Sequence, residues 1–502
     1  MFVSAGRRLM EALSRDDTDV PREPIMSFLG GKPGAGKSQV IRALQALASS
    51  WKCSEAAGTV SYQGVAAQSA NGETIHKFFG WRLGGFSKTQ QVTAGQREKM
   101  CKLKLLIMDE VSTTDAKIIG MVDSSLRHIR NEPDLVFGGV DVLFVGDWLQ
   151  QQPVAGVVVY VSVPPYCGHQ HGDYFFQSRG IQAYSLVRNV VMLTENMRYR
   201  NDPEWRDILD RWRVGNYTQS DVDKVNSLCY TNSWRSRNLE NESFCPIHVT
   251  SNALRSQLNA LSLRAYGNTH HIDLHRFPAV VSRRKVDLDG TTTKSLKTIR
   301  DDKTAGMAIM LEIGLGAPVQ CTKNTSRSLK LANGSIGFVT GFVPASTDKP
   351  VSTTHSVYTE VTHSKSPEVV FIKLRDYEDV QFFPFLPNGV VPVRLRYEKS
   401  VKVQLPNRSF SINIIQVPVI PAYSITTEKC QGMTLEKIVL APLRHATRRS
   451  PQRSSFYVAA TRVKSLRQLY LMEKLSLEEL TSYFTPNPAA MAETRRLEAL
   501  EQ

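Results

Sequence analysis

The segment from Gly31 to Ser38 reads GKPGAGKS, and its residue types suit the binding of a nucleoside triphosphate. Glycines at Gly31, Gly34 and Gly36 allow backbone N–H groups to curl around phosphate oxygens. Lys37 would place a positive charge on the outer phosphates, and the Ser38 hydroxyl would be a ligand for Mg²⁺. The spacing therefore predicts a phosphate-binding loop that takes ATP and Mg²⁺ as cofactors.

Further polar groups stand where two apolar runs end. The run LKLLIM leads into Asp109 and Glu110. Here the Asp would hold Mg²⁺ through water, and the Glu would orient and deprotonate the attacking water. The run DVLFVG ends at Asp147, and Gln150 follows three residues later. We expect this second pair to sense the terminal phosphate.

These groups need a frame that brings several strand ends together. Residues 25–29 form a short apolar run typical of a buried parallel strand, and apolar residues recur at helical spacing after the loop. Strands alternating with helices around a phosphate-binding loop predict a parallel α/β ATPase core. Later segments, from VMLTENMR to YVAATRV, indicate a second α/β layer, with Arg198 and Arg462 as candidates to reach the nucleotide.

The series of motifs resembles the superfamily 1B DNA helicases of the petite-integration-frequency (Pif-type) family, over about Gly30 to Met472. GKPGAGKS is similar to motif I, YQGVAAQSANGETIHKFFG to motif Ia, and LLIMDE to motif II. The stretch FGGVDVLFVGDWLQQQPV resembles the entry to motif III, LTENMR motif IV, ITTEKCQGMTL motif V, and YVAATRV motif VI. Similar domains also end rolling-circle transposon proteins of the Helitron kind.

The resemblance implies an α/β fold class with two RecA-like P-loop NTPase domains, a small 1B wedge element and an inserted SH3-like β-barrel (2B). The implied bounds are 1–195 for domain 1A with 1B at about 80–102, 196–317 and 419–475 for domain 2A, 318–418 for 2B, and 476–502 for a C-terminal tail.

The same resemblance assigns roles to residues. Arg198 and Arg462 are similar to the arginine fingers of the family, and Gln150 would contact the γ-phosphate. Gln431 and Gly432 would help to bind the nucleotide and link it to DNA. The candidates for DNA contact are Gly64, Thr74, His76, Glu428, Lys429 and Thr434. A structural role for the histidine stays open.

Several positions depart from the family pattern. Gly6 or its neighbours stand where a Gln usually reads adenine, and Gln63 stands where Thr is common. Gln151 and Gln152 replace the Leu-Pro of motif III, and Glu428 replaces a His in motif V, where a carboxylate would repel DNA phosphates. The nucleotide-handling residues are intact, so we expect a working ATPase with altered DNA contacts.

The composition favours a polyanionic partner, since 62 Lys and Arg stand against 47 Asp and Glu. The resemblance implies single-stranded and forked DNA as partners and 5′-to-3′ movement. No run of about 18 apolar residues occurs, so we expect no membrane partner, and we expect a monomer on DNA. We expect a nuclear protein, with the mitochondrion as an alternative. Two other functions stay open: a degenerate nucleic-acid-binding module that does not unwind, and an RNA-directed motor of superfamily 1.

For two groups of side chains a structural role is an alternative to a functional one. Helical spacing favours a core position for Trp205 and Trp212 over base stacking, whereas Trp81 and Trp148 stay open. A second group, in PYCGHQHGDY, has three possible zinc ligands without a distant fourth, which favours a polar loop over a zinc site. Its members are Cys167, His169 and His171.

Overall fold

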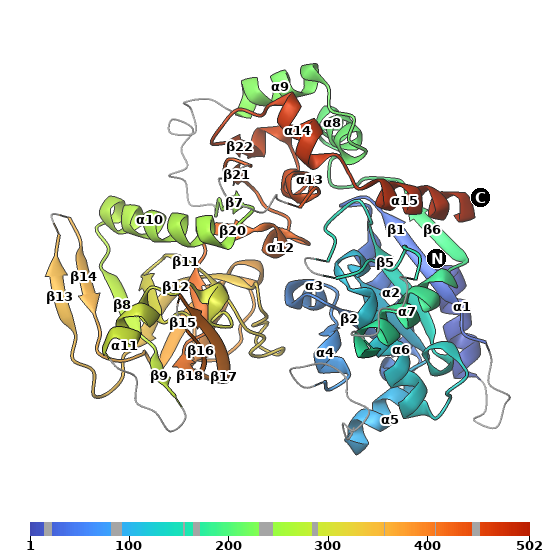
Figure 1. Ribbon diagram of the computed structural model, residues 1–502, viewed down its shortest axis with the longest axis horizontal. Coiled ribbons are helices and arrows are strands. Elements are labelled where there is room, and N and C mark those ends of the chain that lie inside the picture. Colours follow the sequence, from blue (N-terminus) through green and yellow to red (C-terminus); the bar gives the residue numbers. More distant parts are fainter. Residues whose placement is uncertain are drawn as a thin grey trace. The chain divides into compact units, whose positions relative to one another are not determined.

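The computed structural model divides the chain into two compact units (Figure 1). Unit 1 contains residues 1–238, 430–436 and 443–502, and unit 2 contains residues 239–429 and 437–442. The structure describes residues 1–14, 23–81, 93–153, 156–163, 171–229, 244–283, 290–355, 357–406, 408–443 and 452–501. Each unit is considered by itself below.

Unit 1 is built on a parallel sheet of six strands in the order β3-β2-β4-β5-β1-β6. In that order the strands span Glu73–Thr74, Ala57–Ser61, Leu105–Asp109, Asp141–Gly146, Met26–Gly31 and Asn189–Leu193. Strands β1, β2, β4 and β5 are buried along their whole length, which explains their near-continuous apolar sequences. The sheet is of the kind typical of RecA-like domains and confirms the predicted parallel core.

Alternate residues of the central strands enter two separate hydrophobic clusters. Phe28 and Phe144 pack with helices α6 (Ala116–Arg130) and α7 (His171–Ser185), whereas Leu29 packs with α1 (Phe2–Leu13) and α2 (Lys37–Ser50). Successive side chains of a strand point to opposite faces, so each face of the sheet has its own helical cover (Figure 1).

Helix α8 (Pro203–Arg213) illustrates how the local sequence determines where a helix of unit 1 begins and which face it buries. Asp202 caps its N-terminus by accepting from the backbone N–H of Trp205. The predicted inward face is confirmed, since Trp205, Ile208, Leu209 and Trp212 are all buried. The remaining helices described in this unit are α3 (Gly64–Ser69), α4 (Ile75–Phe78), α5 (Ala94–Lys102), α9 (Gln219–Cys229), α13 (Ser455–Ala460), α14 (Leu477–Phe484) and α15 (Pro488–Glu501).

The C-terminal helix α15 belongs to the core of unit 1. Ala490 and Leu497 join the cluster beneath α6 and α7, and the Glu501 carboxylate accepts a hydrogen bond from Met192 N on β6 at 2.7 Å. Because β6 is an edge strand, this contact covers a backbone donor that the sheet leaves open. The predicted helical tail is thus part of the fold.

Unit 2 is rich in antiparallel strands. One sheet has the order β16-β15-β12-β11-β19, with strands Val390–Arg394, Val369–Leu374, Ile336–Val343, Pro318–Cys321 and Val419–Pro421. A second has the order β10-β8-β14-β13, with strands Met310–Gly314, Leu274–Pro278, Thr359–Thr362 and Val351–Thr354. A third has the order β17-β18-β9, with strands Arg396–Leu405, Arg408–Gln416 and Val280–Ser282.

Unit 2 also contains a small parallel group. Strands β20 (Ser424–Thr426) and β21 (Ile438–Leu440) both pair with β7 (Ile247–Val249), and α10 (Asn252–His270) follows β7. The short helices α11 (Gly290–Lys297) and α12 (Thr427–Cys430) complete the described helices. Strands β11 and β12 pair antiparallel, and 14 residues lie between Cys321 and Ile336.

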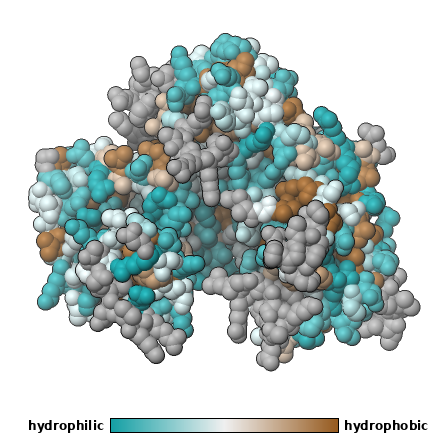
Figure 2. All heavy atoms as spheres, viewed as in Figure 1, coloured by the Kyte–Doolittle hydropathy of each residue, from teal (hydrophilic) through white to brown (hydrophobic). Residues whose placement is uncertain are grey.

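Figure 2 shows hydrophilic residues over most of the visible face and hydrophobic ones gathered in a few small patches. No helix in the described ranges is long and apolar enough to cross a membrane. The two units do not coincide with the predicted domains, because unit 1 takes in residues 196–229 and the C-terminal segments. The 1B, 2A and 2B bounds stay predictions, and residues 82–92 of the 1B segment lie outside the described part.

Candidate nucleotide-binding site

The glycine-rich loop lies between β1 and α2. Gly34 and Gly36 have φ angles of 85° and 95°, a region that side chains with a Cβ rarely adopt. No side chain caps α2, which begins at Lys37, so its first backbone N–H groups face the loop. Donors of this kind, with the positive end of the helix dipole behind them, bind phosphate.

Lys37 lies inside this loop. Its Nζ donates hydrogen bonds to the carbonyl oxygens of Gly31 at 2.6 Å and Lys32 at 3.3 Å. Burial lowers the pKa of the Lys37 ammonium, and the nearby carboxylates of Glu110, Asp147 and Asp109 oppose that shift. The ammonium group therefore rests on neutral carbonyls within the field of three acidic side chains.

The acidic pair stands at the end of β4. Burial, and then the charge of Glu110, raise the pKa of Asp109 above its ordinary value, although Lys37 and a 3.0 Å hydrogen bond from Glu110 N oppose that shift. Glu110 itself has a φ of 51°, an uncommon backbone conformation for a residue with a Cβ. Asp109 and the exposed Ser38 hydroxyl offer the hard oxygen ligands that Mg²⁺ prefers, so these residues fit the ion.

The candidate sensor loop after β5 is held by a buried ion pair. Arg213 Nη2 lies 2.8 Å from Asp147 Oδ1, and Gln150 Nε2 lies 3.4 Å from Asp147 Oδ2. Burial would raise the pKa of Asp147, but Arg213 and Lys37 outweigh it and hold the pKa below its ordinary value. Arg213 did not emerge from the sequence, because nothing in the sequence around it indicates a partner 66 residues away.

Arg198 lies against the glycine-rich loop. A Cβ on Gly34 would come within 2.5 Å of Arg198 Cβ, and Met197 N donates to Gly34 O at 3.2 Å. The guanidinium donates to Thr461 O at 2.8 Å and to Thr434 Oγ1 at 3.1 Å. The structure thus places Arg198 beside the predicted phosphate site.

Arg462 is more deeply buried, with 2% of its surface exposed. Its guanidinium donates to Val458 O at 2.7 Å, to Thr461 Oγ1 at 2.6 Å and to Met433 O at 3.4 Å. Burial, and then the charge of Arg462, lower the pKa of Arg198. Among the ion pairs of the described residues none joins either guanidinium to a carboxylate, so the two neighbouring positive charges are not neutralised by an acidic side chain.

Gln431 links motif V to the acidic pair. Its Nε2 donates to Glu110 Oε2 at 3.0 Å, and its Oε1 accepts from Gln63 Nε2 at 3.3 Å. The next residue, Gly432, has a φ of 78° and open space around it. The sequence showed Gln63 only as a departure from the family pattern, since its partner is 368 residues away.

The candidate DNA contacts of unit 1 fall in two places. Gly64 begins α3, and Thr74 precedes α4. His76 is half-buried, with its ring centroid 5.5 Å from that of Trp81 and 6.2 Å from that of Tyr62. Burial lowers the pKa of His76, so the ring is neutral near pH 7.

Tyr62 is 46% exposed and was missed as a stacking candidate. The sequence signal that could have identified Tyr62 is that it is an aromatic residue within motif Ia. Thr434, the other candidate in unit 1, contacts Arg198 and so lies at the nucleotide side.

Glu428 and Lys429 lie in unit 2 on helix α12. Lys429 Nζ donates to Asn333 Oδ1 at 2.5 Å, and burial lowers the pKa of the ammonium to about 8. Glu428 is half-buried, and its charge opposes part of this lowering of the Lys429 pKa. Both stay candidates for DNA contact.

The open questions about aromatic residues and metal are partly settled. Trp148 is 2% exposed and stacks on Phe28, and Trp81 is 8% exposed and donates to Ser125 Oγ, so both belong to the core. Residues 164–170 lie outside the described part, so the zinc candidate stays untested. Elsewhere in the described chain no group of three His, Cys, Asp or Glu could hold a metal.

Comparison with known proteins gives one consistent result. Residues 17–211 match the family described as PIF1-like helicase. "ATP-dependent DNA helicase PIF1" of Emericella nidulans is 24% identical over 82% of this chain and 54% of its own length. The protein of the same name from Danio rerio is 24% identical over 92% of this chain and 61% of its own length. The chain thus spans between one half and two thirds of these relatives.

Two solved structures share the fold over nearly the whole chain. Pif1 helicase from Bacteroides, in complex with ADP-AlF3 and ssDNA, aligns with a TM-score of 0.66 at 20% identity, covering 99% of this chain and 98% of its own. Pif1 helicase from Candida albicans aligns with a TM-score of 0.65 at 20% identity, covering 98% and 97%. Residues 17–211 are thus similar to PIF1-like helicases, and nearly the whole chain shares the fold of solved Pif1 helicases.

Proposed function

We propose that the protein is an ATP-dependent DNA helicase that moves 5′-to-3′ along single-stranded DNA and unwinds duplex DNA. The observation that carries the proposal is the cluster in unit 1, where the loop lysine, the acidic pair with its partner Gln431, and Arg198 lie at the glycine-rich loop and the neighbouring strand end. We expect an ATPase that is similar to helicases in fold and in sequence to move along a nucleic-acid strand.

Hydrolysis would proceed by attack of water on the γ-phosphorus. The bond from phosphorus to the β,γ-bridging oxygen breaks, ADP leaves with those electrons, and Glu110 accepts the proton of the water. Lys37 would turn from the loop carbonyls to the phosphate oxygens, and Arg198 would offset the charge of the transferred group. Mg²⁺, held by Ser38 and Asp109, would supply Lewis-acid stabilisation of the phosphate charge.

The finer fold assignment supports this motor. We propose that residues 196–317 and 419–475 form the second RecA-like domain and that 318–418 form the SH3-like insertion. The five-stranded antiparallel sheet of unit 2 supports the insertion. The wedge at about 80–102 stays part of the proposal, with α5 as its described portion.

DNA as the track is supported by charge and by relatives. The formal net charge is +15, which favours a polyanion. The Pif1 helicase structure from Bacteroides holds ssDNA, and a further solved structure concerns unwinding at forked dsDNA by two coordinating Pif1 helicases. We extend single-stranded and forked DNA to this chain, with a monomer as the expected unit on the strand.

The test is strand displacement with matched tailed duplexes. Unwinding with ATP of a duplex with a 5′ tail, and none with a 3′ tail, is the expected result. Lys37→Ala should abolish both unwinding and DNA-stimulated hydrolysis, whereas Lys102→Ala, a change at an exposed lysine, should leave the DNA-stimulated hydrolysis intact. Binding without displacement would indicate the non-unwinding module, and stronger stimulation by RNA than by DNA would indicate an RNA-directed motor.

A further inference from the structure

A second cavity lies in unit 1 beside the sensor loop. Its volume is about 320 Å³, which is within the range of small-molecule sites, about 300–1,000 Å³. The loop after β5, the end of α8, the start of α13 and the connection from α14 to α15 all contribute to its lining. Nothing in the proposed hydrolysis uses this cavity.

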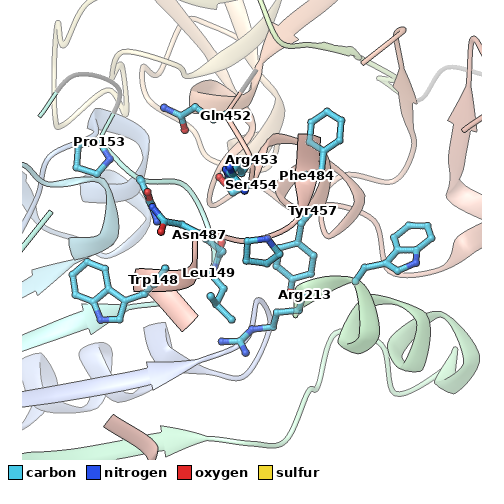
Figure 3. A pocket seen from close by; sticks show the side chains of 15 residues that line it. Trp148, Leu149, Pro153, Arg213, Gln452, Arg453, Ser454, Tyr457, Phe484 and Asn487 are labelled. Carbon is cyan, nitrogen blue, oxygen red and sulfur yellow. The ribbon is translucent and has the colours of Figure 1, made fainter. Parts of the chain in front are cut away.

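The walls of the cavity are aromatic. Trp148, Trp212, Tyr457 and Phe484 line it, and each is at most 4% exposed. Figure 3 shows Trp148 and Phe484 on opposite sides of the cavity, with Tyr457 between them in that view. Flat apolar walls of this kind stack on planar rings.

The lining carries little net charge. Arg213 is balanced by Asp147 at 2.8 Å, and no Asp or Glu lines the cavity. Arg453 is exposed, so its guanidinium lies where the cavity meets solvent. The interior therefore suits a neutral ring, and the rim suits an attached anionic group.

Two lining groups have unused hydrogen-bonding capacity. Trp212 is fully buried, and its indole Nε1–H has no acceptor within the described part of the chain. The Oε1 atom of Gln452 is buried and, among the same residues, has no donor. A buried unpaired polar group costs about 1–3 kcal/mol, so both atoms favour a ligand that has an acceptor and a donor.

We propose that this cavity binds a single nucleobase, stacked on its aromatic walls and hydrogen-bonded to Trp212 and Gln452. A base is planar and neutral, and its edge carries both donors and acceptors that amide side chains recognise. Its sugar-phosphate would lie toward Arg453. The base could come from a free nucleoside or from a strand, and only the second source rests on the proposed helicase function.

The cavity also borders Gln150, the candidate phosphate sensor. Gln150 contacts Asp147, which in turn pairs with Arg213, and both Gln150 and Arg213 line the cavity. Occupation by a base would therefore act on the sensor loop through Gln150 and Arg213. Each base captured could change the rate of ATP turnover.

The structure supplies a matched pair of variants. Trp205 and Trp212 are both fully buried, and both have an indole N–H without a described partner, but only Trp212 lines the cavity. Full-length protein with ADP–aluminium fluoride at the nucleotide site is titrated with adenosine, guanosine, cytidine and thymidine by calorimetry. Wild type should bind at least one nucleoside, Trp212→Phe should weaken it about 5- to 10-fold, and Trp205→Phe should leave it unchanged.

A second arm separates the two sources of the base. Oligothymidylates carrying one abasic residue at successive positions are titrated in the same way. If the strand supplies the base, one position should lower wild-type affinity but not that of Trp212→Phe. A nucleoside effect without a positional effect would assign the cavity to free ligands.

The proposal fails if no nucleoside binds and no abasic position matters, or if both Trp variants behave alike. Gln452→Leu, at a half-buried position, gives an independent check should Trp212→Phe lose its fold in thermal unfolding. The nucleoside arm does not use hydrolysis, so it remains informative even if Lys37→Ala shows that the ATP-site assignment is wrong.

Discussion

Gln431 donates a hydrogen bond to the carboxylate of Glu110, with 3.0 Å between Nε2 and Oε2. Gln431 is 1% exposed and Glu110 is half-buried, so this hydrogen bond to a charged group is partly shielded from water, which strengthens it. Gln63 completes the chain by donating to Gln431 Oε1 at 3.3 Å. Motifs Ia, II and V are thereby joined through three side chains, and the middle one fixes the orientation of the candidate base.

Replacing Gln431 with Leu should lower kcat for ATP hydrolysis more than it changes KM. A hydrogen bond to a charged group contributes about 1.5–3 kcal/mol, so a loss of about 10-fold or more in kcat is expected. Gln63→Thr, which restores the family's usual residue, should have a smaller effect because its bond is longer and indirect. Steady-state ATPase kinetics check both, and an unchanged kcat for Gln431→Leu would contradict the positioning role.

We expect substitutions of Arg198 and Arg462 to differ in their effects on activity and on stability. Arg198 lies beside Gly34, so Arg198→Ala should cost about 10³-fold or more in hydrolysis with a small change in Tm. Arg462 is buried and bonded to motifs V and VI, so Arg462→Ala should also lower Tm by several degrees. Thermal unfolding and ATPase assays on both variants give the answer. A normal Tm for Arg462→Ala would argue against the anchoring contacts.

Local pattern was enough to find the nucleotide site. The loop from Gly31 to Ser38, the strand before Asp109 and the buried face of α8 all follow from spacing that a single segment contains. The parallel sheet of unit 1 agrees with the predicted parallel core. The loop, the strand and the buried helix face each depend on neighbours a few residues away.

Long-range partners could not be read in the same way. Asp147 with Arg213 and Gln63 with Gln431 are joined across 66 and 368 residues, and neither member of a pair identifies the other. Trp148 was open because its burial depends on Tyr184 and Phe28 from other elements. Gly6 lies on α1, where a Cβ would come 3.1 Å from Leu47 Cδ2, so packing on α2 explains its small size.

The C-terminal helix should stabilise unit 1 through a buried carboxylate. Tyr184 donates to Glu493 Oε1 at 2.6 Å, and Arg496 bonds both oxygens of Glu493. Because Glu493→Ala leaves the Tyr184 hydroxyl without this acceptor, unfolding free energy should fall by about 1–3 kcal/mol. Glu498→Ala serves as the control on the same helix. Denaturant unfolding that shows no difference between the two would contradict the contact.

Glu428 should weaken the binding of single-stranded DNA. It is half-buried beside Lys429, and a carboxylate facing phosphates is repulsive. Glu428→His should tighten DNA binding and leave ATP affinity nearly unchanged, and Glu428→Gln should give part of the gain by removing the charge alone. Fluorescence anisotropy at fixed salt measures both. Equal affinities in all three proteins would mean that this side chain does not face the strand.

Lys429 should make DNA binding sensitive to alkaline pH. Burial lowers the pKa of its ammonium to about 8, against an ordinary value of about 10.4, so the charge is lost as the pH rises through 8. If Lys429 contacts a phosphate, wild-type affinity for single-stranded DNA should fall severalfold between pH 7 and pH 9. Lys429→Arg keeps its charge over this range and should show no such fall. A parallel fall in both proteins would assign the pH dependence to another group.

The lowered pKa of Lys429 should also affect the stability of the protein, and stability should change with pH in the direction opposite to DNA affinity. The folded pKa lies below the unfolded one, so between about pH 8 and 10.4 the unfolded chain holds the extra proton. The contribution of Lys429 to the free energy of unfolding should therefore rise with pH across that window. Lys429→Met, which cannot be charged, should remove this part of the slope. Denaturant unfolding at pH 7.5 and pH 9.5 would measure this slope. Over the same range the affinity for DNA should fall while the free energy of unfolding rises. These two opposite trends are expected only of a lysine that burial favours as neutral but that must be charged to bind.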